Sequence, residues 1–165
     1  MGQDILIGIG ANLPSLGGAP PIDAARNAVI SLDSLPQLRL VGLSRWYESD
    51  PIPPSGQETY VNGMAHFRGR IGPAELLAVL QRIEQQAGRR RGVANAARTL
   101  DLDIVAMGDL VRSAPDPVLP HPRAHLRAFV LHPLADLLPH WVHPVSGQNL
   151  ADLIAALPPQ VIRAL

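Results

Sequence analysis

The sequence predicts an α+β sandwich in which two helices cover one face of a four-stranded antiparallel sheet. Short apolar runs with a period of two alternate with longer stretches whose apolar residues recur at helical spacing. The order of these runs along the chain is strand, helix, strand, strand, helix, strand. The 165 residues are 47% apolar and 17% charged, which is enough to bury one core. We therefore expect a single domain over residues 1–165.

The first half of the chain contributes one helix and three strands. A Gly/Pro-rich loop runs to Pro21, and the helix after it has Asp23 as its expected N-cap and Pro36 just beyond its end. Residues 48–57 are too long and too rich in proline to form a simple hairpin turn, and loops of this kind are often functional. The three strands are expected at residues 4–10, 38–47 and 60–67.

The second half begins with the clearest helix of the chain, which opens at Pro73 and is capped by Gly88. A basic loop then leads into a strand at 98–104, and two further helices are expected at 129–138 and 149–157. The order β-α-β-β-α-β is that of the ferredoxin-like sandwich, here with extra helices at the C-terminus. Because both helices of that fold lie on one face, we expect the other face to be free for a ligand.

The strand at 98–104 places two carboxylates side by side. Its period of two sends Asp101 and Asp103 to one face and three apolar side chains to the other. Adjacent carboxylates repel each other, and a cation that prefers oxygen ligands, such as Mg²⁺, offsets that repulsion. The apolar set on the opposite face is Leu100, Leu102 and Ile104. The pattern therefore indicates a metal site on one face and core on the other.

Basic residues surround this strand in the sequence. Arg98 stands at its entry, an arginine run at 89–91 precedes it, and His121, Arg127 and Phe129 follow further along. Cations beside a metal-binding carboxylate pair are what a polyphosphate requires. Each feature also has a simpler interpretation: a solvated strand face, a helix end favoured by its macrodipole, and a structural histidine. From the residues alone, both interpretations stay open.

Composition excludes several other classes of function. The net charge is zero, with 14 basic and 14 acidic residues, so nucleic acid and anionic membranes are not expected partners. There is no cysteine, and the six histidines lack the spacing of a zinc site. The glycine spacings of the Rossmann and Walker motifs are absent. No apolar run is long enough for a signal peptide or a membrane span, and we expect a cytoplasmic protein that acts as a monomer.

Together these motifs resemble those of the 6-hydroxymethyl-7,8-dihydropterin pyrophosphokinases of folate biosynthesis, a family with a ferredoxin-like fold. The resemblance extends nearly from end to end, and the combination of its motifs is highly specific. It rests on Ile7-Gly8-Ile9-Gly10-Ala11-Asn12-Leu13, on Tyr47 and Asn62, on Arg98-Thr99-Leu100-Asp101-Leu102-Asp103-Ile104, and on Leu119-Pro120-His121-Pro122.

The resemblance implies roles for particular residues. Asp101 and Asp103 would hold two Mg²⁺ ions that bridge the phosphates of ATP, and with Arg89 and Arg98 they form the implied catalytic set. The implied ATP-binding positions are Gln81, Glu84, Arg89, Arg91, Arg98, Ile104, His121 and Arg127. The implied pterin-binding positions are Ser49, Asp50, Ile52, Tyr60, Asn62 and Phe129, with Tyr60 and Phe129 as an aromatic sandwich.

The sequence departs from the pattern of the family in three places. Asn95-Ala96-Ala97 stands where many members have Trp-Gly-Pro, in a loop that is one residue shorter, so an aromatic cover over the site is missing or supplied elsewhere. Asp50 replaces a common proline. Asp116 replaces a residue that is basic in some members, which puts one nucleotide contact in doubt.

The implied reaction transfers the β,γ-pyrophosphoryl group of ATP to the hydroxymethyl oxygen of the pterin and releases AMP. Metals and arginines suit such a reaction, because the protein mainly positions the reactants and neutralises charge. Two alternatives remain: another Mg²⁺-dependent nucleotidyl or phosphoryl transferase on the same fold, and a non-enzymatic ligand-binding or RNA-binding module. The second alternative needs exposed aromatic residues on the sheet, and only Tyr60 is placed for that role.

Overall fold

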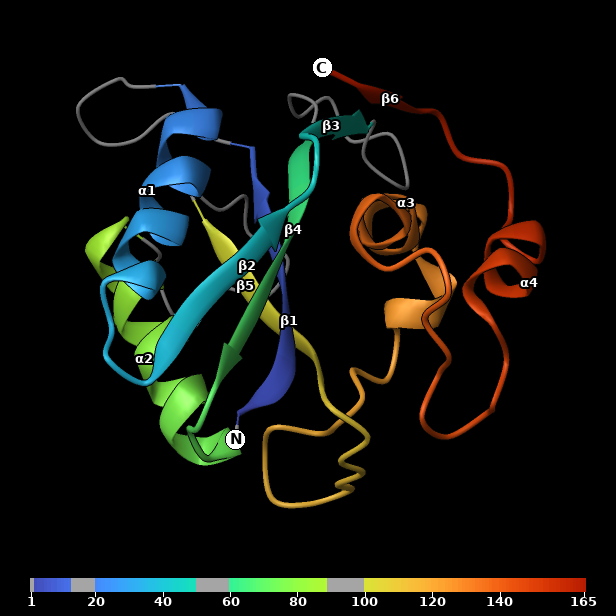
Figure 1. Cartoon of the computed structure of the whole chain (residues 1–165). Coiled ribbons are helices and arrows are strands. Elements are labelled where there is room, and N and C mark those ends of the chain that lie inside the picture. The colour runs from blue at the N-terminus through green and yellow to red at the C-terminus, as the bar shows by residue number, and fades with distance from the viewer. Residues whose placement is uncertain (1, 13–19, 50–59, 89–99) are drawn as a thin grey trace.

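The computed structural model of the protein describes residues 2–12, 20–49, 60–88 and 100–165 (Figure 1). Its strands are β1 (Gln3–Ala11), β2 (Leu38–Leu43), β3 (Tyr47–Ser49), β4 (Tyr60–Gly69), β5 (Asp101–Met107) and β6 (Ile162–Ala164). Its helices are α1 (Pro21–Asp33), α2 (Pro73–Gln86), α3 (Ala128–Leu137) and α4 (Leu150–Ala155), and a 3₁₀ turn covers Ala124–Leu126. None of these helices combines the length and the apolar character that spanning a membrane requires.

The strands form one antiparallel sheet in the order β5-β1-β4-β3-β6, and β2 also pairs with β4. β2 and β3 follow each other along the same edge of β4, so they occupy the place of one longer strand. Without β6, this is the strand order expected of the ferredoxin-like sandwich. The short strand β6, which the sequence analysis missed, pairs with β3 through Tyr47↔Ala164 and Ser49↔Ile162.

Helices lie on both faces of the sheet (Figure 1). α1 and α2 cover one face, where the larger core forms around side chains such as Ile5, Ile7, Phe67 and Leu80. α3 packs on the other face against β4, and the core there includes Leu6, Met64 and Leu131. The expectation of a free second face is therefore wrong in part, because the apolar side chains that alternation sends to this face are covered by α3 and α4.

The expected strand at 38–47 is interrupted at Ser44, where two hydrogen bonds between this residue and the backbone of Met64 take the place of regular strand pairing. Its backbone N–H donates to the carbonyl oxygen of Met64 at 2.9 Å, and its Oγ accepts from the backbone N–H of Met64 at 2.8 Å. Both backbone groups of Met64 are therefore satisfied without a regular strand partner. The chain turns here and resumes pairing at β3.

The helix ends follow local sequence signals, with one exception. α1 starts at Pro21 with Pro20 as its N-cap, and Asp23 lies inside the first turn, so the expected cap at Asp23 is wrong. Proline at the first helical position already supplies a helical φ angle. α2 starts at Pro73, and Gly88, with φ of 96°, follows its end as expected. α4 is capped by the side chain of Asn149.

Candidate active site

Two glycines of β1 form the floor of a cavity on the sheet face that carries α3. Gly10 lies between Asn62 of β4 and Asp101 of β5 in one row of paired residues, and Gly8 is paired with Asp103 in a parallel row. Because glycine has no side chain, the space above β1 stays open between the polar groups of its two neighbouring strands. A Cβ atom on Gly10 would come within 3.0 Å of the Asn62 Oδ1, so this floor has little room for any larger residue.

Both aspartates of β5 line this cavity, together with Asn62, His121 and Arg127. Leu100 precedes the two aspartates and Leu102 lies between them, and both leucines point into the core beneath α2. The division of the strand into a carboxylate face and an apolar face is therefore confirmed. Strand alternation alone accounts for it, because neighbouring side chains of a strand point to opposite faces.

A β-bulge in β5 brings a distant loop to the aspartates. The register shifts between Leu6 and Ile7 of β1, so that Val105 is the extra residue of β5. The carbonyl oxygen of Val105 then accepts a hydrogen bond of 2.9 Å from the backbone N–H of His121. The bulge thus anchors the loop that carries the histidine, and no sequence signal for it was recognised.

The same loop sets the orientation of the His121 ring. The backbone N–H of Arg123 donates to Nδ1 of His121 at 3.1 Å, so the proton of the neutral imidazole resides on Nε2. Nε2 lies 4.0 Å from Oδ1 of Asp103. Burial, the neighbouring Arg127 and, to a lesser extent, Arg123 lower the pKa of His121, and the nearby Asp101 opposes them. His121 is therefore a neutral donor at pH 7, directed into the carboxylate region.

Arg127 and Phe129 enter the cavity from the start of α3. Arg127 directly precedes the helix, and its guanidinium carbon lies 5.4 Å from the centroid of the Phe129 ring. This distance is within the range of a cation–π contact. A cation and an aromatic ring therefore meet at the wall of the cavity, next to the two carboxylates.

The opposite side of the cavity is lined by Asn62 and Gly63 of β4. Asn62 is buried, and its Nδ2 donates to the Oγ of Ser49 at 3.2 Å. Ser49 is itself only 1% exposed. The side chain of Asn62 is therefore held in one orientation by a buried partner. Tyr60 is paired with Ser49, and strand alternation sends it to the same face as Asn62, but it is not among the residues that line the cavity.

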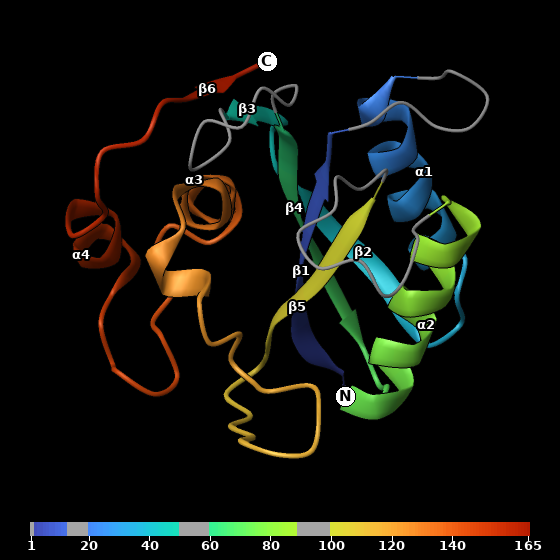
Figure 2. The ribbon, with the colours of Figure 1, turned by 180° about the vertical axis from the view of Figure 1, so that it is seen from behind.

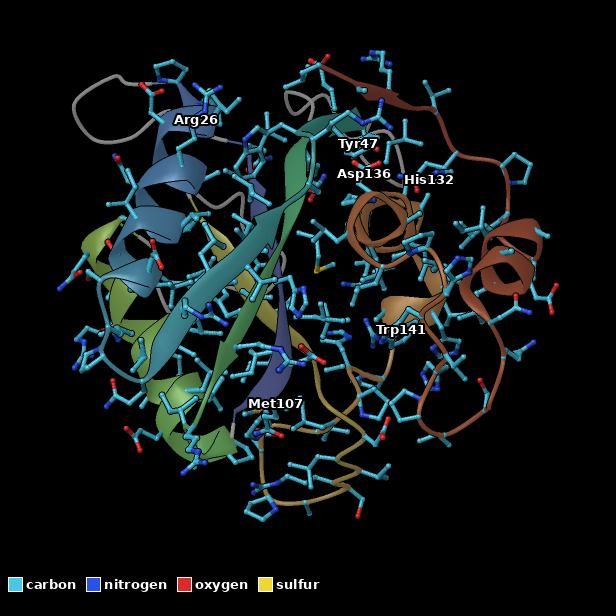
Figure 3. The ribbon with its side chains drawn as sticks, viewed as in Figure 1. Arg26, Tyr47, Met107, His132, Asp136 and Trp141 are labelled. Atoms are coloured by element: carbon cyan, nitrogen blue, oxygen red, sulfur yellow. The ribbon has the colours of Figure 1, made fainter. Side chains whose placement is uncertain are left out.

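A network missed by the sequence analysis joins β3 to α3, and thereby joins the two sides of the site. The Tyr47 hydroxyl donates to Oδ2 of Asp136 at 2.7 Å, and the two residues lie side by side in Figure 3. Arg45 Nη2 donates to Oδ1 of Asp136 at 3.0 Å. Burial raises the pKa of Asp136, but the hydrogen bonds from Arg45 and Tyr47 outweigh this and lower it. Burial and Asp136 raise the pKa of Tyr47.

Three residues implied in ATP binding lie away from the cavity, on the side of the sheet that α1 and α2 cover. Gln81 is exposed on α2, and the side chain of Ile104 is buried in the core, 4% exposed. Glu84 is 2% exposed and accepts a backbone hydrogen bond from Leu102 at 2.8 Å. Their contact with a nucleotide stays a prediction. Asp50, Ile52, Arg89, Arg91 and Arg98 lie outside the described residues.

The donor set of the cavity is suited to Mg²⁺. No group of three or more His, Cys, Asp or Glu side chains that could hold a metal occurs in the part of the chain that the structure describes. Two carboxylates on one strand face are nevertheless what Mg²⁺ uses when substrate phosphates and water complete its octahedral shell. A zinc or calcium site would need more protein ligands than these.

Comparisons with known proteins identify relatives of the chain. The sequence model of the family described as 7,8-dihydro-6-hydroxymethylpterin-pyrophosphokinase matches residues 6–139. The 2-amino-4-hydroxy-6-hydroxymethyldihydropteridine pyrophosphokinase of Pseudomonas aeruginosa is 39% identical over 163 residues, which are 99% of this chain and 97% of that protein. The protein of the same name from Synechocystis is 36% identical over 90% of this chain and 73% of its own length.

A solved structure supports the fold independently. The crystal structure of wild-type Plasmodium falciparum HPPK-DHPS superposes with a TM-score of 0.70 at 12% identity, over 94% of this chain and 44% of that one. The resemblance inferred from the motifs is therefore confirmed, and with it the prediction of an enzyme rather than a non-enzymatic binding module. The chain belongs to the family of 7,8-dihydro-6-hydroxymethylpterin pyrophosphokinases.

Proposed function

We propose that this site transfers the pyrophosphoryl group of ATP to the hydroxymethyl group of 6-hydroxymethyl-7,8-dihydropterin, giving AMP and the pterin diphosphate. One observation carries the proposal. Two carboxylates, a neutral imidazole and a guanidinium converge above a glycine floor, beside a buried amide and an aromatic ring. The carboxylates, the imidazole and the guanidinium suit a metal–polyphosphate. The amide and the aromatic ring suit a flat heterocycle with hydrogen-bonding edges.

Asp101 and Asp103 are the proposed ligands of two Mg²⁺ ions. Bound there with ATP, Mg²⁺ would supply neutralisation of the phosphate charge. The protein contributes the rigid spacing of the two carboxylates, since both project from one strand that pairs with β1. Their mutual repulsion also makes the carboxylate pair a strong attractor for cations.

His121 and Arg127 are the proposed phosphate contacts of the described residues. His121 donates from Nε2, and Arg127 offers a delocalised charge with several donors to phosphate oxygens. Because His121 is neutral at pH 7, its hydrogen bond adds no charge that would compete with the metal ions. The arginines at 89, 91 and 98 belong to the same proposal by resemblance alone.

The pterin would occupy the side of the cavity next to β4. Asn62 offers amide groups to the edge of the heterocycle, and Ser49 keeps the amide in place. Phe129 would stack on one face of the ring, and Tyr60 on the other, as the resemblance implies. Asp50 and Ile52 complete the proposed pocket, and Gln81 and Ile104 are kept as proposed nucleotide positions.

No described side chain is assigned as the general base for the hydroxymethyl proton. Asp103 stands near the proposed metals, and a carboxylate bound to a metal is a weak base. The reaction can proceed without a dedicated base, because phosphoryl-type transfer depends mainly on alignment and charge neutralisation.

Product analysis tests the proposal directly. The full chain is incubated with ATP and hydroxymethyldihydropterin, with and without Mg²⁺, and the products are separated by chromatography. We expect AMP and a diphosphorylated pterin, formed only with Mg²⁺. Release of inorganic pyrophosphate would instead indicate nucleotidyl transfer, and ADP would indicate transfer of a single phosphoryl group.

The proposed activity uses the chain as one pyrophosphokinase domain, because its site draws on elements from β1 to α3. We also propose a monomer that binds neither nucleic acid nor membranes and resides in the cytoplasm. Sedimentation and cell fractionation would test the monomeric state and the location.

A further inference from the structure

A carboxylate is buried directly behind the metal-binding strand. Glu84 belongs to the last turn of α2 and is 2% exposed. Its Oε2 accepts a hydrogen bond of 2.8 Å from the backbone N–H of Leu102. Burial of a carboxylate is unfavourable unless hydrogen bonds compensate it, and the C-terminal end of a helix disfavours negative charge further. The bond to Leu102 is one of the interactions that offset this cost.

Leu102 is the residue between the two aspartates. Its partner in β1 is Ile9, and the flanking pairs are Asp101 with Gly10 and Asp103 with Gly8. Within the described residues β5 pairs only with β1, so it is an edge strand that lies beside α2 (Figure 2). Edge strands carry outward backbone groups that no neighbouring strand satisfies. Glu84 therefore takes the place of a missing strand at this amide.

The bond constrains the direction of both carboxylates. The Leu102 side chain is buried in the core beneath α2, and the N–H of the same residue is held by α2 through Glu84. A rotation of the peptide unit between Asp101 and Leu102 would turn the Asp101 side chain directly, and it would move the Asp103 side chain through the backbone of Leu102. Fixing this one peptide unit therefore limits the motion of two metal ligands at once.

We propose that Glu84 is a positioning residue, which holds the Leu102 amide so that Asp101 and Asp103 present their carboxylates to the metal ions. The effect on metal binding rests on the proposed function, whereas the hydrogen bond from Leu102 to Glu84 does not. It differs from the direct nucleotide contact that the family resemblance implies. Glu84 acts from the side of the sheet that α1 and α2 cover, whereas the aspartates face the cavity on the side of α3.

The two roles make different demands on the side chain. A positioning residue must only accept a hydrogen bond, which the amide oxygen of glutamine also does. A residue that binds cations or nucleotide through its charge loses this ability when the charge is removed. Glu84→Gln therefore preserves the first role and abolishes the second, whereas Glu84→Met removes the acceptor at similar volume. Gln86→Ala, at an exposed position two residues later on α2, is the matched control.

The experiment measures two quantities on the full chain with each variant. One is the hydrogen exchange rate of the Leu102 amide, followed by NMR. The other is the dissociation constant for Mn²⁺ in the presence of a non-hydrolysable ATP analogue. We expect Glu84→Met to speed Leu102 exchange at least tenfold and to weaken Mn²⁺ binding at least tenfold. Glu84→Gln and Gln86→Ala should stay within threefold of the wild type in both.

Two results would overturn the inference. One is loss of Mn²⁺ binding in Glu84→Gln with Leu102 still protected, which would assign a direct role to the charge. The other is normal Mn²⁺ binding in Glu84→Met. If Glu84→Met does not fold, Glu84→Asp serves instead, since the shorter side chain should raise the exchange rate and weaken binding together. Neither readout requires pterin turnover, so a failure of the proposed reaction is recognised separately.

Discussion

The imidazole of His121 faces the carboxylate of Asp103, with 4.0 Å between Nε2 and Oδ1. This separation is too long for a hydrogen bond and leaves the two groups on either side of a small gap. The pairing depends on the β-bulge at Val105, whose carbonyl oxygen binds the His121 amide. A hydrogen-bond donor and a carboxylate are thereby brought together from positions 18 residues apart in the chain.

Replacement of either aspartate should remove activity without loss of the fold. We expect Asp101→Ala and Asp103→Ala each to lower kcat by about 10²-fold or more, because each removes a ligand of the proposed metal site. The melting temperature should stay the same or rise, since the repulsion between the two carboxylates is relieved. Asp109→Ala, at an exposed turn position after β5, is the control. Normal kcat in either variant would refute the metal assignment.

His121 should make stability depend on pH near neutrality. Its pKa in the folded state lies below the ordinary value of 6.5, so the unfolded chain takes up the proton first as pH falls. The stabilisation is complete above pH 6.5 and is lost as pH falls through the lower folded value. We expect urea unfolding to show a smaller decrease in stability between pH 7.5 and 5.5 in His121→Gln than in the wild type. Identical slopes would contradict the prediction, because His143, whose pKa is also lowered, would then account for the decrease.

The two floor glycines should differ in their tolerance of a methyl group. A Cβ on Gly10 would lie 3.0 Å from Asn62 Oδ1, whereas one on Gly8 would lie 3.5 Å from Val105 Cγ2, an ordinary contact. We therefore expect Gly10→Ala to displace the Asn62 amide and to raise the dissociation constant of the pterin more than Gly8→Ala does. Calorimetric titration of both variants measures this difference, and equal affinities would show that Asn62 can shift without loss of binding.

The bond between Tyr47 and Asp136 should stabilise the docking of α3 on the sheet. Tyr47→Phe removes a buried hydrogen bond to a carboxylate and should lower the free energy of unfolding by about 1–2 kcal/mol, as measured in urea. Tyr47 is 6% exposed, so the ring itself stays packed in the variant. Unchanged stability would indicate that Arg45 alone holds Asp136.

The same network should contribute to acid sensitivity. The folded-state pKa of Asp136 is lowered, so its contribution is present above the ordinary value of 3.8 and is lost as pH falls through the folded value. Asp136→Asn should therefore reduce the loss of stability below pH 4. The exposed Asp109→Asn is the control and should follow the wild type. A steep acid transition that persists in Asp136→Asn would assign it to another carboxylate, such as Asp4, whose pKa His66 and Arg68 lower.

Arg127 should act on the transition state more than on binding. If its guanidinium leaves the Phe129 ring to meet charge that develops on the phosphates, Arg127→Ala lowers kcat about tenfold or more, which corresponds to 1.4 kcal/mol. The dissociation constant of ATP should change less. Steady-state kinetics with a separate measurement of ATP binding tests this split. A raised KM with unchanged kcat would make Arg127 a binding group only.

The order of the central strands and helices, the two faces of β5 and the family could all be predicted from the amino-acid sequence. These features depend on local periods and on short motifs, which do not require knowledge of distant contacts. Asp101 and Asp103 could be assigned to one face because a strand alternates wherever it lies. Alternation likewise places Gly8 and Gly10 on one face of β1.

Which residues meet across the surface of β1 depends on how distant segments pack together. The bulge at Val105, the Ser44 bridge to Met64 and the bond between Tyr47 and Asp136 join segments far apart in the chain, and each depends on register or on the docking of α3. Register is a property of paired strands and cannot be read from one strand. For the same reason the sequence places Glu84 on a helix, and the resemblance predicts a nucleotide contact for it, while its bond to Leu102 depends on the packing of α2 against β5.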